Sequence, residues 1–198
     1  MKTIFIMEDH PIVSESLASF FNDTGRWNVL GTSSSLAEAK EKIPLLKNID
    51  VLLMDILLPD GWGIDIVNWL KKQNYKLPLL AVYTAFDDYS YVSSALNLGV
   101  MVYMIKLRNK EKLENAIINA FDGIVCIDED AQRKINKITS LTDTLTNRES
   151  EILINVKKGL TNEEIAVNLS ISPRTVSNII SCILDKTGIK SRRALEKI

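Results

Sequence analysis

The stretch VLLMDILLPDG, residues 51–61, decides the fold of this chain. Its four leading apolar residues show no polar alternation, which predicts a strand buried on both faces, as in a parallel sheet. Asp55 closes that strand and opens a turn that contains Pro59 and Gly61. A carboxylate at the mouth of a buried strand is poorly solvated unless another group balances its charge. We therefore expect a charged site around Asp55.

Apolar strand patterns and amphipathic helix patterns alternate along the first part of the chain. Five βα units of this length predict an α/β domain built on a doubly wound parallel sheet. The predicted strands lie near residues 3–8, 27–32, 50–54, 78–83 and 100–105, and the predicted helices near 12–23, 36–46, 62–73, 87–98 and 110–122.

Other polar side chains stand where the predicted strands end: Glu8 and Asp9 at the first, Thr84 after the fourth and Lys106 after the fifth. The carboxyl ends of parallel strands meet at one edge of a sheet, so these side chains should converge on Asp55. Three carboxylates repel one another unless a hard cation lies among them, and oxygen ligands suit Mg²⁺. Thr84 can donate a hydrogen bond, and Lys106 supplies a mobile positive charge. A metal, a nucleophilic carboxylate, a hydroxyl and an ammonium are what phosphoryl transfer onto an aspartate requires.

With these side chains, residues 1–122 resemble the receiver domain of bacterial two-component response regulators. The resemblance implies that Asp55 accepts a phosphoryl group and that Glu8, Asp9 and Asp55 hold Mg²⁺. It also implies a flavodoxin-like, five-stranded sheet with strand order 2-1-3-4-5. A sensor histidine kinase would then be the partner. The protein is not expected to be an enzyme beyond its own phosphoryl transfer and slow dephosphorylation.

The same resemblance implies a conformational switch at Thr84 and Tyr103. After phosphorylation Thr84 would turn inward to hydrogen-bond the phosphate, and Lys106 would pair with the phosphoryl oxygens. Tyr103 would follow into the space that Thr84 vacates. Such a two-state element would alter the surface around the fourth helix and the fifth strand.

Simpler interpretations of the acidic residues stay open. Glu8 and Asp9 could cap the helix that Pro11 begins, and Asp55 could cap the following turn. His10 is the only histidine, which argues against general-base or zinc chemistry built on histidine, and it is interpreted as a positional feature of the first loop. An aspartyl-phosphate hydrolase would also use a strand-end aspartate, but such enzymes generally need a second aspartate two residues on, where this chain has leucine.

Length and composition indicate a globular protein of two small domains. The 198 residues are 25% charged and 46% hydrophobic. No run of about 18 apolar residues occurs, and the start lacks a basic segment followed by an apolar one, so we expect a cytoplasmic protein without a membrane partner. Cys126 and Cys182 belong to no recognisable motif and are expected to stay reduced.

The net charge of −1 hides an asymmetry between the two parts of the chain. Residues 1–130 hold 12 Lys and Arg against 18 Asp and Glu, whereas residues 131–198 hold 12 against 7. A basic segment joined to an acidic one suggests that the second part meets a polyanion. Residues 123–143 have mixed charge and little apolar periodicity, so they are interpreted as a linker that can contain a helical piece.

Residues 144–198 carry helix signals throughout. Capping boxes start the first two predicted helices, and an N-cap serine followed by proline starts the third. A three-residue link between the second and third helices predicts a helix-turn-helix, whose second helix would enter the major groove of DNA. The signals are Thr146 with Glu149, Thr161 with Glu164, Ser172 with Pro173, and the helix-ending Gly159 and Gly188.

This segment resembles the LuxR-type DNA-binding domain that the NarL/FixJ group of response regulators carries, a group to which the string EDHP at residues 8–11 also points. The resemblance implies a transcription regulator that binds double-stranded promoter DNA and is a homodimer when active. The residues that carry it are 145–149, 159–166, Leu169, Ser172, 175–176, Lys186, Gly188 and 191–192.

Two positions depart from the LuxR-type pattern, which has a lysine and a histidine where this chain has Ser177 and Ile179. Without that lysine, affinity for DNA should depend more on the remaining basic residues. A receiver-controlled adaptor, whose helical domain binds a protein instead of DNA, is the alternative function. The residues expected to contact DNA are Arg174, Thr175, Ser177, Asn178, Ser181, Lys186, Lys190, Arg192 and Arg193.

Overall fold

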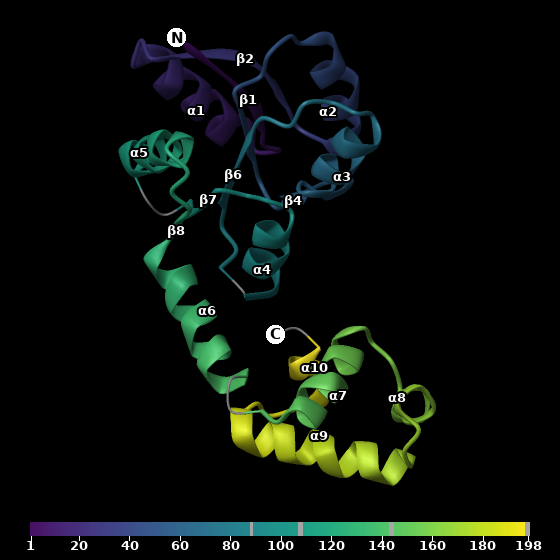
Figure 1. Cartoon of the computed structure of the whole chain (residues 1–198). Helices are drawn as coiled ribbons and strands as arrows, with labels where there is room; N and C mark the ends of the chain where they lie inside the picture. Colours follow the sequence, from purple (N-terminus) through teal and green to yellow (C-terminus); the bar gives the residue numbers. More distant parts are fainter. Residues whose placement is uncertain (88, 107–108, 143–144, 197–198) are drawn as a thin grey trace. The chain divides into compact units, whose positions relative to one another are not determined.

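The computed structural model describes the chain except for residues 88, 107–108, 143–144 and 197–198 (Figure 1). The chain forms two compact units, Met1–Ala131 and Gln132–Ile198. None of the helices in the described part of the chain combines the length and the apolar character needed to cross a membrane.

The first unit is built on a parallel sheet of six strands, in the order β2-β1-β3-β6-β7-β8. Its first five members confirm the predicted strands and the predicted order. β1, β3, β6 and β7 are rich in apolar residues because helices cover both faces of the sheet, whereas β2, at the sheet edge, is only partly buried. The strands are β1 (Lys2–Met7), β2 (Trp27–Ser33), β3 (Val51–Met54), β6 (Leu79–Thr84), β7 (Val102–Ile105) and β8 (Cys126–Ile127).

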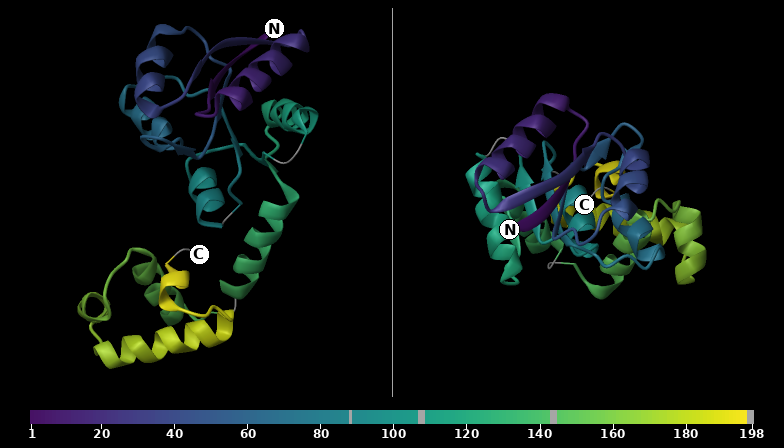
Figure 2. Two further views of the ribbon diagram at one scale, coloured as in Figure 1. Left: turned by 180° about the vertical axis from the view of Figure 1, so that it is seen from behind. Right: turned by 90° about the horizontal axis from the view of Figure 1, so that it is seen from above.

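Five helices connect these strands, close to the ranges predicted from hydrophobic periodicity. Helices α1 and α5 lie on one face of the sheet, and α2 and α3 lie on the other (Figures 1 and 2). The bounds are α1 (Pro11–Asp23), α2 (Leu36–Lys42) continued by the short 3₁₀ helix η1 (Ile43–Leu45), α3 (Asp65–Lys72), α4 (Tyr89–Asn97) and α5 (Lys110–Phe121).

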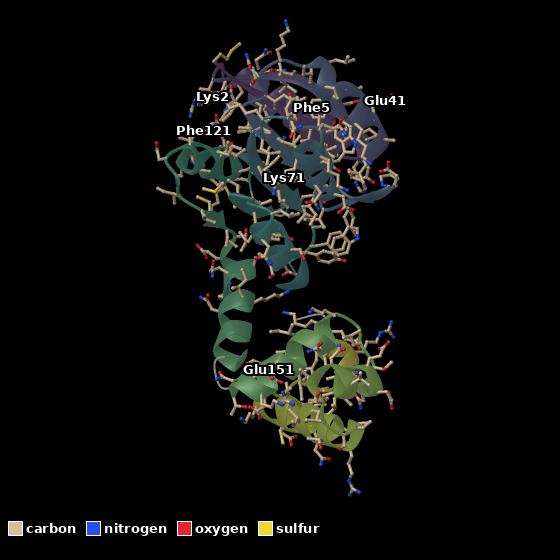
Figure 3. The ribbon with its side chains drawn as sticks, turned by 45° about the vertical axis from the view of Figure 1, so that its right-hand side comes forward. Lys2, Phe5, Glu41, Lys71, Phe121 and Glu151 are labelled. Atoms are coloured by element: carbon tan, nitrogen blue, oxygen red, sulfur yellow. The ribbon has the colours of Figure 1, made fainter. Side chains whose placement is uncertain are left out.

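Aromatic packing ties the beginning of β2 to α5. Glu114 is buried, and its Oε1 accepts a hydrogen bond of 2.8 Å from Trp27 Nε1, which satisfies part of the buried carboxylate. The rings of Trp27 and Phe121 lie 6.3 Å apart between centroids. Lys2 Nζ lies 3.8 Å from the centroid of the Phe121 ring, a cation–π contact whose two side chains are labelled in Figure 3.

A small antiparallel hairpin, β4 (Leu57–Leu58) with β5 (Gly61–Trp62), follows β3 and was not predicted. Two-residue strands are too short to show a period, so only their turn residues are visible in the sequence. The Asp60 carboxylate at the turn accepts hydrogen bonds of 2.8 Å from the backbone N–H groups of Leu36 and Ala37, at the start of α2. The hairpin is therefore fixed to the first turn of α2.

The stretch 123–143, which was interpreted as a linker, contains regular structure. Strand β8 extends the sheet, since Cys126 N donates to the Met101 carbonyl and Asp128 N donates to the Tyr103 carbonyl, both at 2.8 Å. Helix α6 (Glu129–Thr142) follows and spans the division between the two units. A two-residue strand has no periodicity to detect, whereas α6 does separate apolar from polar residues at the helical period, so the interpretation of its range as a linker missed a helix.

The second unit consists of α7 (Asn147–Lys157), α8 (Asn162–Leu169), α9 (Pro173–Thr187) and the short α10 (Arg192–Leu195), besides most of α6. Both predicted capping boxes are present, with Glu149 N donating to Thr146 Oγ1 and Glu164 N donating to Thr161 Oγ1. Gly188 ends α9 at φ +67°, as predicted for a glycine C-cap. The buried core of the unit comprises Ile152, Leu153, Val156, Ile165, Ala166, Val176, Ile180, Ile183 and Leu195.

Candidate metal centre and helix-turn-helix surface

The ends of β1 and β3 bring three carboxylates together, as the strand-end argument predicted. The two strands are paired in parallel with Met7 opposite Met54, and Asp55 N donates a hydrogen bond of 2.9 Å to the Met7 carbonyl. Glu8 and Asp55 are 3% and 5% exposed, so both carboxylates are shielded from water. Buried charges of one sign require a cation, and this edge of the sheet is where one would bind.

Lys106 supplies one cation to this edge. Its Nζ lies 2.6 Å from Asp55 Oδ2 and 2.5 Å from Glu8 Oε2. Burial alone would lower the pKa of Lys106, but the hydrogen bonds to Asp55 and Glu8 outweigh it and raise that pKa above its ordinary value. The ammonium therefore stays protonated and holds the two carboxylates together.

Asp55 is positioned by its backbone as well as by its charge. Its Oδ1 accepts a hydrogen bond of 2.6 Å from the backbone N–H of Ile56, which leaves Oδ2 for Lys106. Its carbonyl oxygen packs against Gly63, where an added Cβ atom would lie only 1.9 Å from it. Gly63 N in turn donates 2.8 Å to the Ile56 carbonyl. No other residue type fits at position 63 without displacing the backbone of Asp55.

Thr84 and Tyr103 are linked through the backbone of Phe86. Thr84 is fully buried, and its Oγ1 accepts a hydrogen bond of 3.4 Å from Phe86 N. The Tyr103 hydroxyl donates 2.7 Å to the Phe86 carbonyl, and the Tyr103 ring is completely buried. The resemblance implied that Tyr103 follows Thr84 into the space that Thr84 vacates; the Tyr103 ring is buried in this structure, and its part in a switch stays a prediction.

The acidic residues fit a divalent metal. Glu8, Asp9, His10 and Asp55 each offer one ligand atom, and these atoms all lie within 4.8 Å of one another. Asp9 Oδ1 is a buried atom whose printed contact is with His10 Nδ1, at 2.8 Å. Carboxylate oxygens gathered in this way are donors that Mg²⁺ prefers.

His10 is the residue of this cluster that the sequence analysis did not assign to a site. Its Nδ1 lies 2.8 Å from Asp9 Oδ1 and 3.1 Å from Glu8 Oε1. The contacts with Glu8 and Asp9 raise the pKa of His10 above its ordinary value. Its place directly after an acidic pair was visible in the sequence, but a single histidine gives no ligand spacing to recognise.

In the second unit, α9 presents exposed polar side chains between residues 174 and 181. They are those of Arg174, Thr175, Ser177, Asn178 and Ser181, all of which were expected to contact DNA. Ile179 is different, because it is partly buried and packs against the apolar core. The histidine of the LuxR-type pattern is thus replaced by a residue that contributes to packing.

Two of the basic residues expected to contact DNA are engaged within the second unit. Lys186 Nζ lies 2.7 Å from Glu149 Oε2, the same oxygen that caps the Thr146 backbone. The guanidinium of Arg192 donates to the Leu160 carbonyl and, at 2.5 Å, to Asn162 Oδ1. Both contacts join helices, so these two cations have a structural use.

The other three basic candidates are Arg174, Lys190 and Arg193. All three are exposed, and none of them forms a hydrogen bond or ion pair with another described residue. Charges without an internal partner are available to an anionic ligand. Of the five basic residues that the sequence predicted to contact DNA, three are therefore available to an anion in the described part of the unit.

Each of the two units matches a known protein family. Residues 4–118 match the response regulator receiver domain, and residues 143–197 match the bacterial regulatory proteins of the luxR family. The transcriptional regulatory protein DesR of Bacillus subtilis is 33% identical over 192 residues, covering 97% of this chain and 93% of DesR. The response regulator protein VraR of Staphylococcus aureus is 30% identical over 196 residues, covering 97% of this chain and 92% of VraR.

Solved structures resemble the chain over nearly its whole length. The response regulator RcsB in complex with DNA is 25% identical, has a TM-score of 0.70, and the match covers 98% of this chain and 96% of RcsB. RcsB from Salmonella enterica serovar Typhimurium bound to the promoter rprA, with a TM-score of 0.71 and 24% identity, shows the same fold over 99% of this chain and 96% of that one.

The fold and the acidic site together define a two-component response regulator. Within that class, the chain belongs to the family that joins a receiver domain to a luxR-family domain, the NarL family in which DesR and VraR are found.

Proposed function

We propose that a sensor histidine kinase phosphorylates this protein on Asp55, and that the protein regulates transcription by binding promoter DNA through its helix-turn-helix. The observation that carries the proposal is the contact of Lys106 with Asp55 and Glu8 at the carboxyl edge of the sheet. This contact orients the Asp55 carboxylate, the proposed nucleophile, and places the Lys106 ammonium beside it. The receiver match over residues 4–118 supports the same chemistry.

In the transfer, an oxygen of the Asp55 carboxylate attacks phosphorus. A bond forms between that oxygen and phosphorus, and the bond from phosphorus to the donor's histidine nitrogen breaks, with its electron pair staying on that nitrogen. Glu8, Asp9 and Asp55 would hold Mg²⁺, which neutralises charge on the transferring group when bound. Lys106 already touches Asp55 Oδ2, so a small movement brings its ammonium onto the new phosphoryl oxygens.

The Thr84 side chain would change its orientation once Asp55 is phosphorylated. Its Oγ1 currently accepts from Phe86 N, so its own hydroxyl hydrogen is the group that can be donated to a phosphoryl oxygen. Reorienting Thr84 changes the hydrogen bond to Phe86, whose carbonyl is held by Tyr103. This path leads from Asp55 toward the loop before α4 and is the proposed two-state element.

The second unit would bind double-stranded DNA as part of a homodimer. The polar side of α9 would enter the major groove, and the exposed Arg174, Lys190 and Arg193 would contact phosphates. Solved relatives of this fold include RcsB dimers bound to DNA. We place the protein in the cytoplasm, with no membrane partner, and assign it no reaction other than its own phosphorylation and slow dephosphorylation.

The phosphorylation step is tested by incubating the full chain with acetyl phosphate and Mg²⁺ and measuring the intact mass. We expect one phosphoryl group on the wild type and none on Asp55→Asn. Asp65→Asn is the matched control, because Asp65 is an exposed carboxylate at the start of α3 and should be labelled like the wild type. Equal labelling of Asp55→Asn would overturn the assignment.

A second candidate function is an adaptor whose helical unit binds a protein. Ser177 and Ile179 favour it, because they remove two basic or polar contacts from the expected reading helix. Titration of the full chain with random duplex DNA at two salt concentrations separates the two functions. A DNA-binding protein loses affinity steeply as salt rises, since each neutralised phosphate adds about 0.9 to the slope of log K against log salt. The absence of measurable binding at low salt would favour the adaptor.

A further inference from the structure

Three aromatic side chains of the first unit form a continuous row. The ring centroids of Trp62 and Tyr91 lie 5.2 Å apart and those of Phe86 and Tyr91 lie 5.5 Å apart, and in each pair the ring planes are inclined by 55°. Both separations fall in the range of favourable aromatic pairs. Trp62 belongs to β5, Tyr91 to α4, and Phe86 to the segment between β6 and α4. Tyr91 therefore joins the hairpin after β3 to the segment after β6.

The Trp62 end of the row is connected to the acceptor through the backbone. Trp62 pairs with Leu57 in the β4–β5 hairpin, which begins two residues after Asp55. Gly63, the residue after Trp62, packs against the Asp55 carbonyl oxygen. The Trp62 ring is 42% exposed, so the core of the unit holds only part of it. Its contact with Tyr91 is therefore one of the interactions that fix the hairpin beside the acceptor.

The Phe86 end of the row is connected to the proposed switch. Phe86 N donates a hydrogen bond of 3.4 Å to Thr84 Oγ1, and the Phe86 carbonyl accepts one of 2.7 Å from the Tyr103 hydroxyl. A reorientation of Thr84 would thus move the backbone that carries the Phe86 ring. Because Tyr91 contacts this ring as well as that of Trp62, the acceptor hairpin and the switch segment meet at one side chain of α4.

We propose that Tyr91 is a positioning residue for the phosphorylation of Asp55, acting through Trp62 and Phe86, and that phosphorylation in turn displaces the Trp62 ring. The inference rests on the proposed function and adds to it a connection that needs no movement of Tyr103. Packed rings transmit a displacement because close packing leaves them few alternative arrangements. Tyr91 contacts both neighbours, so a shift of one neighbouring ring is passed to the other.

The first test follows the Trp62 ring by fluorine NMR. The full chain is labelled with 5-fluorotryptophan, and its three tryptophans, Trp27, Trp62 and Trp69, are assigned by changing each to phenylalanine. Adding acetyl phosphate to the protein in Mg²⁺ should shift the Trp62 signal of the wild type, and the shift should be lost in Tyr91→Ala. Trp27 is the internal reference, since its ring contacts Phe121 at the end of α5. An unmoved Trp62 signal in the fully phosphorylated wild type, or an equal shift in Tyr91→Ala, would overturn the proposal.

The second test measures how fast acetyl phosphate labels Asp55. Tyr91→Ala and Trp62→Ala should each slow labelling by about threefold or more, since a displaced acceptor reacts less readily. Trp62→Ala removes a ring that is already 42% exposed, so the unit should still fold. Tyr91→Phe keeps the ring and should restore the wild-type rate. Phe121→Ala is the matched control, because its ring is 36% exposed and packs beside Trp27.

The labelling rates and the extent of labelling separate the two proposals. Wild-type rates in Tyr91→Ala, or an equal slowing in the Phe121→Ala control, would overturn the positioning role. The extent of phosphorylation is measured by intact mass on every NMR sample. A wild type that takes up no phosphoryl group would contradict the proposed function itself, whereas complete labelling with an unmoved Trp62 signal would contradict the role of Tyr91 alone.

Discussion

Lys106 Nζ donates a 2.6 Å hydrogen bond to Asp55 Oδ2, although the two residues are 51 positions apart in the sequence. The bond exists because β3 and β7 both end at the same edge of the sheet, with only β6 between them. Lys106 N also donates 2.8 Å to the Thr84 carbonyl, which fixes the start of the loop after β7. The contact places a cation beside the acceptor before any phosphoryl group arrives.

Removing this cation should destabilise the first unit. In Lys106→Met, Glu8 and Asp55 would remain buried without their common partner, and breaking a buried ion pair costs about 3 kcal/mol. Thermal unfolding should therefore occur at a lower temperature than in the wild type. Mg²⁺ should recover part of the loss, because it binds the folded state and replaces the missing charge. Unfolding at the wild-type temperature with and without Mg²⁺ would show that the pair contributes nothing.

Substitution of Gly63 should act on the acceptor. In Gly63→Ala the new Cβ would meet the Asp55 carbonyl oxygen at 1.9 Å, so the backbone of the acceptor must move, at a cost of about 1–3 kcal/mol. We expect slower labelling by acetyl phosphate as well as a lower melting temperature. Gly31→Ala is the matched control, because its Cβ would meet only the Phe5 ring at 3.4 Å. If the two variants label at the same rate, Gly63 does not position Asp55.

The strand-end pattern identified the residues of the acidic site, and the strand order made them neighbours. Asp55, Glu8 and Lys106 each follow an apolar run, and parallel strands in the observed order bring their ends together. The order of the first five strands came from the family resemblance and not from periodicity. Strand β8 and the β4–β5 hairpin were missed because two-residue strands show no period.

The partners of basic side chains could not be predicted from the sequence. Nothing in the sequence distinguishes Lys186 and Arg192 from Lys190 and Arg193. In the structure, however, Lys186 and Arg192 bind groups within the helical unit. Which cation is engaged depends on how α7, α8 and α10 pack, and that is a tertiary property. His10 was likewise assigned no site, since its contacts with Glu8 and Asp9 depend on side-chain orientation.

The Glu149–Lys186 contact should give the helical unit a characteristic acid sensitivity. Lys186 first, and then the Thr146 backbone N–H, lower the pKa of Glu149 from 4.5 to about 2. A depressed pKa stabilises the fold at any pH above the ordinary value of 4.5, and the contribution is lost as the pH falls toward 2. The unfolding temperature of α7 and α9 is measured by NMR at several pH values between 6 and 2. It should fall as the pH drops from 4.5 toward 2.

The matched variant for the acid experiment is Glu149→Gln, which keeps the shape of the side chain and removes its titration. Its melting temperature should start lower than that of the wild type at pH 6 and change less between pH 4.5 and pH 2. If the melting temperatures of the two proteins fall in parallel between pH 4.5 and pH 2, other carboxylates cause the loss of stability in acid.

Arg192 and Arg193 should respond differently when each is changed to alanine. Arg193 is exposed and without a partner in the described part of the unit, so Arg193→Ala should reduce the slope of log K against log salt for DNA by about 0.9. Arg192→Ala should leave that slope unchanged and lower the melting temperature, because the Leu160 carbonyl and Asn162 lose their donor. If both variants reduce the slope of log K against log salt equally, Arg192 contacts DNA phosphates as well.

The central claim is that phosphorylation of Asp55 controls DNA binding, and the most direct test measures both in one titration. The affinity of the full chain for duplex DNA is determined at one fixed salt concentration, with and without acetyl phosphate and Mg²⁺, for the wild type and for Asp55→Asn. We predict that the phosphodonor changes the wild-type affinity by about fivefold or more and leaves that of Asp55→Asn unchanged. The same change in both proteins, or no change in a fully phosphorylated wild type, would contradict the account.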